Sequence, residues 1–193
     1  MQHAKENENP FQPRAAVIAG MVVLAAALRI IPHPMNFAPI GAMVLFSGAY
    51  FSSKRAAVLV PLVALAAGDC FTGFHQLALW VYASFLVSVA IGFWLRRKKS
   101  VARISAATAA GAIQFFLVTN LAVWFSGIGS YSKTPAGLAE CYVRGLPLLG
   151  NTLAADTFYV ALLFGGMALA ERRFPSMREP LAAMAGQNSS LAS

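Results

Sequence analysis

One short segment of the chain, GDCFTGFH (residues 68–75), holds an acid, a thiol and an imidazole. Asp69 and Cys70 follow a long apolar run, and His75 precedes the next one. Such side chains can ligate a metal, exchange protons or hold a polar solute. A zinc enzyme needs three protein ligands in good geometry. Only His33 could join these three residues, and the sequence has no HExxH-like spacing.

The elements around this segment are strongly apolar. The chain has 193 residues, of which 58% are hydrophobic and 11% are charged, whereas soluble domains carry about 25% charged residues. We therefore predict a single-domain, all-α integral membrane protein. Its hydrophobic segments lie at about 15–31, 36–51, 56–69, 76–95, 103–126 and 152–170.

Two of these segments have features that disfavour a straight helix. The second begins HPMNFAPIGAM, and the third contains Pro61. Several segments are also shorter than the roughly 20 residues that cross a bilayer as a straight helix. We expect irregular or partly re-entrant backbone in the second and third segments.

The basic residues predict how the chain is oriented. With the N-terminus in the cytoplasm, six spans leave only Arg29, Lys133 and Arg144 of the 15 Lys and Arg residues outside. This agrees with the excess of Lys and Arg in cytoplasmic loops. The net charge of +8 is then a sign of topology, and we expect no nucleic-acid partner.

The same orientation divides the chain. Residues 1–14 form a cytoplasmic tail, 15–171 form the six-helix transmembrane domain, and 172–193 form a second cytoplasmic tail, which we expect to be disordered. A cleaved signal peptide is the rival interpretation of the first apolar segment. Both termini are predicted to lie inside; the family resemblance given below implies that the membrane is the cytoplasmic (inner) membrane of a bacterium.

The remaining polar residues gather at the predicted extracytoplasmic ends of the spans. Ionisable groups in a membrane are costly, so they often mark a function, although any single one could simply satisfy a helix end. As a set, above an apolar floor, they suit a neutral or zwitterionic solute that arrives from outside. The residues we expect to bind this solute are Arg29, His33, Asn36, Asp69, Cys70, His75, Asn120, Tyr142, Arg144, Asn151 and Asp156.

Cys70 leaves three interpretations open. It could be a small packed side chain, it could form a disulfide with Cys141 on the same side, or it could ligate a soft metal carried by the substrate. No Walker, GxGxxG or GxSxG motif occurs, so we expect neither an ATPase nor a serine hydrolase in this chain.

Small residues four positions apart mark the first and fifth segments. Ala15 and Ala19, and Ala16 and Gly20, form two such pairs in the first. Small residues let helix backbones approach closely in lipid. They serve either packing within the monomer or docking of another membrane subunit.

Several blocks of the sequence resemble a family of small bacterial six-helix membrane proteins. These blocks are RIIPHPMNFAPIGAMVLFSGAYF, GDCFTGFH, FFLVTNLAVW, GLAECY and NTLAADTFYVALLFGG, and the resemblance covers about residues 28–167. This family in turn resembles the substrate-binding S components of energy-coupling factor (ECF) vitamin transporters. The resemblance implies an S-component-like bundle with an outward-facing pocket, in which the first helix docks a coupling subunit served by ATPases.

Within that group, the solitary cobalamin transporters of the BtuM type are the closest functional analogues. They imply that Cys70 ligates the cobalt of bound cobalamin and assists removal of its upper cyanide. Cobalamin would then be a substrate, and no intrinsic cofactor is expected. The competing class is a non-transport membrane protein, either a structural or assembly factor or an enzyme at the outer leaflet.

Overall fold

The protein is a bundle of helices. The structure is a computed structural model that describes residues 13–28, 32, 34–74 and 76–178. Over these residues it contains no strand, which confirms the predicted all-α class. The elements are α1 (Pro13–Leu28), α2 (Ile40–Tyr50), α3 (Lys54–Thr72), α4 (Ala78–Leu95), α5 (Val101–Ser126), α6 (Pro135–Arg173) and the short 3-10 helix η1 (Pro175–Met177).

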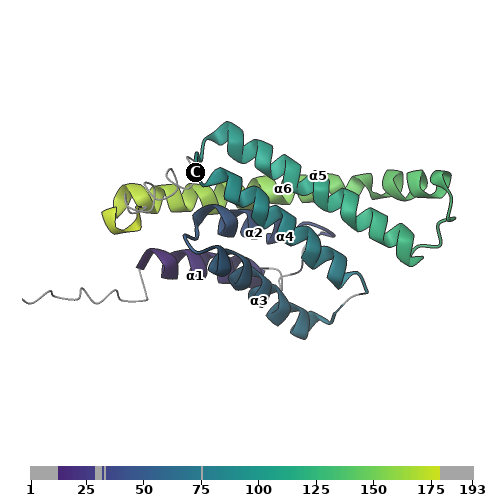
Figure 1. Ribbon diagram of the computed structural model, residues 1–193, viewed down its shortest axis with the longest axis horizontal. Coiled ribbons are helices and arrows are strands. Elements are labelled where there is room, and N and C mark those ends of the chain that lie inside the picture. The colour runs from purple at the N-terminus through teal and green to yellow at the C-terminus, as the bar shows by residue number, and fades with distance from the viewer. Residues whose placement is uncertain (1–12, 29–31, 33, 75, 179–193) are drawn as a thin grey trace, which may run out of the picture.

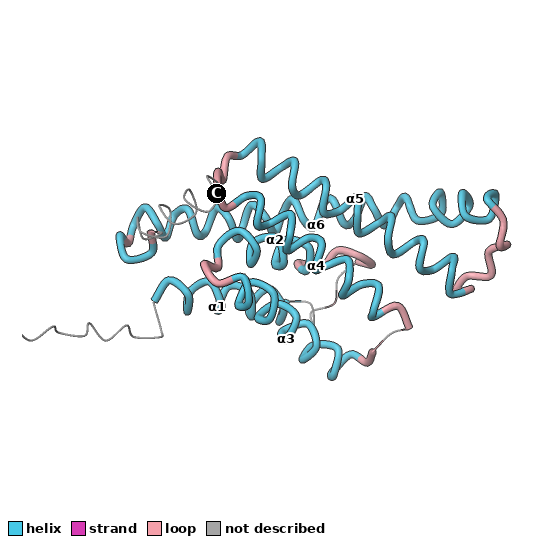
Figure 2. The backbone as a smooth tube through the Cα atoms, viewed as in Figure 1, coloured by secondary structure: helices cyan, strands magenta, loops and turns pink. Residues whose placement is uncertain are grey.

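The connections between helices collect at the two ends of the bundle (Figures 1 and 2). One end holds the start of α1, the α2–α3 and α4–α5 connections and the end of α6. We call it the basic end, because Lys54, Arg97 and Arg173 lie there. The opposite end holds the α3–α4 and α5–α6 connections. This arrangement agrees with the sequence, in which basic residues are concentrated in alternate connections between the apolar segments.

Three helices, α4, α5 and α6, are long and apolar enough to cross a membrane. Helices α1 and α2 are apolar but shorter. At 1.5 Å per residue, the 11 residues of α2 extend only about 16 Å, roughly half of the hydrocarbon core. A helix this short must begin or end inside the bundle.

Two sequence expectations about helix shape are wrong. The third segment is a continuous helix of 19 residues despite Pro61. The outer connection expected before residue 152 is largely helical, because α6 already begins at Pro135 and runs for 39 residues. Thr134 caps this helix through its side chain, and Pro135 occupies its first turn, where proline loses no hydrogen bond. A sequence window that looks for apolar residues misses such a polar extension.

Helix α2 is the centre of the core. It packs against each of the other five α-helices, and residues 42–50 are all buried. Phe46 makes edge-to-face contact with Phe164 of α6, with ring centroids 5.5 Å apart. Because helix α2 is apolar all round, it is stable only when other helices enclose it.

Close backbone contact joins α2 to α4. A Cβ atom on Gly92 would lie 2.5 Å from the Leu45 carbonyl oxygen and 2.9 Å from Gly48 Cα. A Cβ atom on Gly48 would lie 2.3 Å from the Val89 carbonyl oxygen. Only glycine at both positions allows the two backbones to lie this near to one another.

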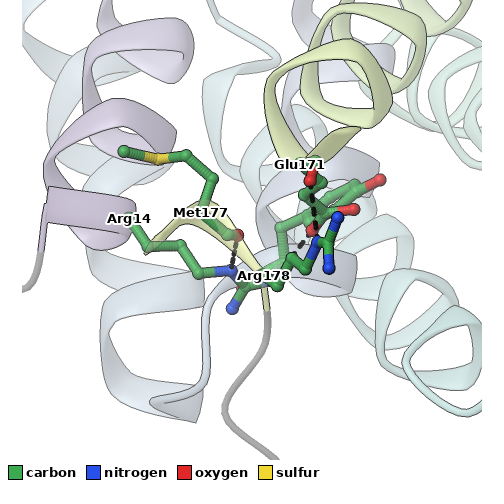
Figure 3. Close-up of polar contacts among 5 residues, drawn as sticks. Arg14, Glu171, Met177 and Arg178 are labelled. Carbon is green, nitrogen blue, oxygen red and sulfur yellow. Dashed lines mark hydrogen bonds and ion pairs between the residues drawn. The ribbon is translucent and has the colours of Figure 1, made fainter. Parts of the chain in front are cut away.

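A hydrogen-bond cluster ties the start of α1 to the end of α6 and the residues that follow it, at the basic end (Figure 3). Arg14 is 4% exposed, and its Nε donates to the Met177 carbonyl oxygen at 2.9 Å. Its guanidinium also lies 3.5 Å from the Glu171 carboxylate. Arg178 donates to the Glu171 carbonyl oxygen at 3.0 Å. The residues after α6 therefore pack against α1.

Candidate functional site

The N-terminus of α2 lies inside the bundle, where a side chain from α6 completes it. The residue before α2, Pro39, supplies no side-chain cap. Instead Asp156, which is 4% exposed, accepts a hydrogen bond at Oδ1 from the Ala42 backbone N–H at 3.1 Å. A carboxylate at this end of a helix satisfies an unpaired N–H and interacts favourably with the helix dipole.

Gly41 makes room for this carboxylate. A Cβ atom at residue 41 would lie 2.4 Å from Asp156 Oδ1, so a larger residue would displace the carboxylate. The other oxygen, Oδ2, accepts no hydrogen bond from the described part of the chain. Asp156 was expected to open a helix, but it lies well inside α6. Its carboxylate contacts α2 because the N-terminus of α2 lies at the same depth in the bundle.

A small cavity borders the carboxylate. Its volume is about 90 Å³, and α2, α4, α5 and α6 all contribute to its wall. One lining residue, Asn36, is exposed and belongs to the segment before α2. The other lining residues are Ala38, Ile40, Gly41, Phe85, Ser88, Gly111, Phe115, Thr152 and Asp156. A narrower space continues inward past Ser88 and Asp156 to Thr108 and Val160.

A polar network holds one wall of the cavity. Gln114 of α5 donates to Ser88 Oγ at 2.8 Å and to the Ser84 carbonyl oxygen at 3.1 Å. Ser84 donates back to Gln114 Oε1 at 3.0 Å. These bonds join α4 to α5 beside the cavity, where the rings of Phe85 and Phe115 stack at 5.3 Å.

Sequence reasoning missed Ser84, Ser88, Gln114 and Thr152. The two serines and the glutamine sit within continuous apolar segments, and an amphipathic search gives such isolated uncharged residues little weight. One signal was available, since Ser84 and Ser88 lie four residues apart and thus on one helix face.

The cavity wall combines polar and apolar groups. It offers a carboxylate oxygen, two hydroxyls (Ser88 and Thr152) and the Asn36 amide next to apolar and aromatic surface. The described residues include no group of three or more His, Cys, Asp or Glu side chains that could hold a metal ion. The groups that line this cavity are donors and acceptors of hydrogen bonds.

Of the residues predicted to bind solute, Asn36 and Asp156 line this cavity. Asn151 does not line it, and its Nδ2 donates to the carbonyl oxygen of Met35, the residue before Asn36, at 2.9 Å. Asp69 lies between α3 and α4, where its Oδ2 accepts a hydrogen bond from the Tyr82 hydroxyl at 2.6 Å.

Three predicted residues form contacts between or along α5 and α6 instead. Asn120 donates to the Phe116 carbonyl oxygen in its own helix. Tyr142 donates to the Leu117 carbonyl oxygen at 2.9 Å. Arg144 forms an exposed ion pair with Glu140, one turn away on α6. Arg29, His33 and His75 lie outside the described residues.

The two cysteines are separate. Cys70 is an exposed free thiol near the end of α3, and Cys141 is a buried free thiol in α6. The Cys141 thiol donates to the Asn120 carbonyl oxygen at 3.4 Å. The disulfide that the sequence allowed is therefore not formed. Cys70 does not line the cavity beside Asp156.

The small residues of α1 divide between two environments. Ala15 and Ala19 are half-buried, whereas Ala16 and Gly20 are exposed. A Cβ atom on Gly20 would meet no atom within 4 Å. Gly20 is therefore not needed for close packing within the described part of the chain, whereas Ala19 packs against the hydrophobic core. Next to these small residues, α1 and α3 form an apolar groove of about 540 Å³.

Comparison with known proteins gives one family and no named relative. No curated protein and no solved structure matches the chain significantly. A family described as a family of unknown function, DUF6580, matches residues 9–177. Because this match spans the whole helical bundle, the chain belongs to the DUF6580 family.

Proposed function

We propose that this chain is a membrane uptake protein that binds a solute from the extracytoplasmic side, with the cavity beside Asp156 as the deepest part of its binding site. The observation that carries the proposal is a buried carboxylate with one oxygen bound to the α2 N-terminus and a cavity beside it. Ionisable groups at membrane depth usually mark substrate pathways or sites. In the proposed topology, the chain crosses the membrane six times, α2 and the segment before it together make one crossing, and the basic end faces the cytoplasm.

The cavity volume limits what can enter. At about 90 Å³ it is smaller than the roughly 300–1,000 Å³ of typical drug-sized ligand pockets. It is also smaller than the roughly 150 Å³ cavity that accommodates benzene in an engineered protein. It therefore accepts a solute of a few heavy atoms, or one small polar group of a larger, vitamin-like molecule. A larger solute would place its remainder among the outer connections.

Release into the cytoplasm requires movement of the bundle, because the cavity does not continue to the basic end in the described structure. An ECF-type coupling subunit with its ATPases would supply the energy. The exposed Ala16 and Gly20 on α1 would face this subunit, since small residues permit close helix contact in lipid.

Two matched threonines test the proposed site. Thr152 lines the cavity, and Thr119 does not; each donates to the carbonyl oxygen four residues earlier, at 2.9 and 2.8 Å. The purified full-length protein is melted with a panel of water-soluble vitamins and small polar solutes. A solute at a hundred times its Kd should stabilise the protein by about 2.7 kcal/mol. Thr152→Val should weaken its binding by about two- to tenfold, the effect of one hydrogen bond.

Thr119→Val should leave that affinity unchanged, because its hydroxyl lies away from the cavity. Equal losses in both variants would contradict the assignment of the site. If no solute in the panel raises the melting temperature, the competing class is favoured, namely a structural or assembly factor or an outer-leaflet enzyme.

Cobalamin is the specific larger solute that we propose, on the basis of Cys70. Its thiol is free and exposed, as cobalt ligation requires, whereas the cavity is far too small for a corrinoid ring. Protein purified from cells grown with vitamin B12 should be coloured, and the absorbance should show thiolate ligation. Cys70→Ala should remove this spectral feature, while Cys141→Ala should retain it. Colourless protein, or an unchanged spectrum in Cys70→Ala, would contradict the proposal.

A further inference from the structure

The α4–α5 connection at the basic end carries an unusual concentration of positive charge. Five basic residues occur within eight positions, and they are Arg96, Arg97, Lys98, Lys99 and Arg103. No Asp or Glu occurs anywhere from residue 70 to residue 139. Like charges this close repel one another. A bound anion would offset this repulsion.

The structure uses some of these residues to anchor the connection. Arg96 Nε donates to the Gly48 carbonyl oxygen at 2.8 Å, and its Nη1 donates to the Ser52 carbonyl oxygen at 3.3 Å. Lys99 Nζ lies 5.0 Å from the centre of the Tyr50 ring. These contacts hold the connection against the end of α2, so the position of its remaining charges is defined.

Arg103 is held at the side of the bundle. Its guanidinium lies 3.9 Å from the centre of the Trp94 ring, and Nη2 donates to the Trp94 carbonyl oxygen at 3.1 Å. Trp94 itself is 49% exposed. Tryptophan is enriched at the membrane–water interface, so this stacked pair places a guanidinium at the level of lipid headgroups.

Arg97 and Lys98 complete the arrangement. Both are exposed, and no carboxylate of the described residues pairs with either side chain. In the first turn of α5, Arg103 offers guanidinium N–H groups that match the oxygens of a phosphate. Arg97, Lys98 and Arg103, together with Trp94, thus form a basic surface bordered by an interfacial aromatic ring; we call it the α4–α5 basic surface.

We propose that the α4–α5 basic surface binds the phosphate of an anionic phospholipid in the membrane leaflet that surrounds the basic end. Basic residues next to a membrane-spanning helix attract anionic lipid headgroups. The exposed Trp94 ring and the exposed Val101 side chain would contact the acyl-chain boundary. This proposal depends on the surface charge of one connection and is independent of the proposed solute site.

The test measures lipid binding to the purified full-length protein in neutral detergent. Short-chain phosphatidylglycerol and phosphatidylcholine are titrated separately, and the bound lipid is counted by native mass spectrometry. Phosphatidylglycerol should bind more tightly than phosphatidylcholine. The double variant R97Q/K98Q should weaken phosphatidylglycerol binding about thirtyfold, given the usual contribution of each basic residue near an anionic surface.

The matched control is K54Q/R55Q, which removes two exposed charges from the other connection at the basic end. It should leave phosphatidylglycerol binding unchanged. Equal weakening in both double variants would overturn the proposal, because it would indicate general attraction to net charge. Inorganic phosphate should not displace the lipid at equal concentration; full displacement would overturn the lipid assignment in favour of a free-anion site. Equal binding of both lipids would overturn it as well.

Both double variants should melt at the temperature of the parent protein, because the four substituted side chains are exposed. As a second measurement, Trp94 fluorescence should change when phosphatidylglycerol binds to a variant in which the other two tryptophans are replaced, Trp80→Phe and Trp124→Phe. No fluorescence change at saturating lipid would count against contact at this surface.

Discussion

Gly92→Leu should prevent the bundle from folding, or lower its free energy of unfolding by about 3 kcal/mol. The reason is that even the first added atom, Cβ, would lie 2.5 Å from the Leu45 carbonyl oxygen and 2.9 Å from Gly48 Cα. Both obstacles are backbone atoms, so no side-chain rotation relieves the overlap. Helices α2 and α4 would have to separate, and α2 holds the centre of the core.

The measurement is thermal unfolding of the purified protein, with Gly92→Ala as an intermediate step in the series. Gly165→Ala is the control, because a Cβ atom there would meet nothing within 4 Å. It should change the free energy of unfolding by no more than about 1 kcal/mol, the propensity difference of the two residues in a helix. A melting temperature for Gly92→Leu equal to that of Gly165→Ala would contradict the close packing of α2 on α4.

Asp156→Asn and Asp156→Leu should separate the structural role of this residue from its role in binding. Asparagine keeps a side-chain oxygen for the Ala42 N–H, so Asp156→Asn should fold and melt near the parent temperature. Leucine leaves that buried N–H without a partner, and Asp156→Leu should lose roughly 1–3 kcal/mol of stability. Thermal unfolding of both variants measures the difference.

The affinity for a solute should depend on the charge of Asp156 as well as on the shape of its side chain. Asp156→Asn should weaken the binding of a solute found in the melting panel by about 10- to 100-fold, the usual effect of a hydrogen bond to a charged group. Asp69→Asn is the control, since Asp69 is another buried acid and bonds to Tyr82 away from the cavity. Unchanged affinity in Asp156→Asn, or an equal loss in Asp69→Asn, would contradict a site centred on Asp156.

Local sequence composition was enough to predict several features of the fold. Six apolar segments predicted an all-α chain, and the structure confirms helices in each of them. The basic residues of the α2–α3 and α4–α5 connections predicted which connections share one end of the bundle. Such features follow from hydropathy and charge, which are properties of short stretches of sequence.

The boundaries of the helices were harder to predict from the sequence, although the signals that set them are local too. The polar first part of α6 lies outside any apolar window, yet Thr134 and Pro135 start a helix there. The capping threonine and the first-turn proline are the signals that could have found it. Irregular or partly re-entrant backbone was expected in the third segment because of Pro61, but the missing N–H and the ring of this proline are tolerated within a packed helix.

The binding cavity depended on tertiary structure. Sequence alone identified Asp156 and Asn36 as candidate binding residues near one end of the bundle, together with nine other polar residues. Those nine residues either do not line the cavity or lie outside the described residues. Only the packing of helices brought Asp156 of α6 to the N-terminus of α2, 114 positions away in the chain. That pairing depends on the short length of α2 and on Gly41, which leaves room for the carboxylate. A contact between residues so far apart has no signature in either local segment, because it is set by how helices with interchangeable apolar faces pack together.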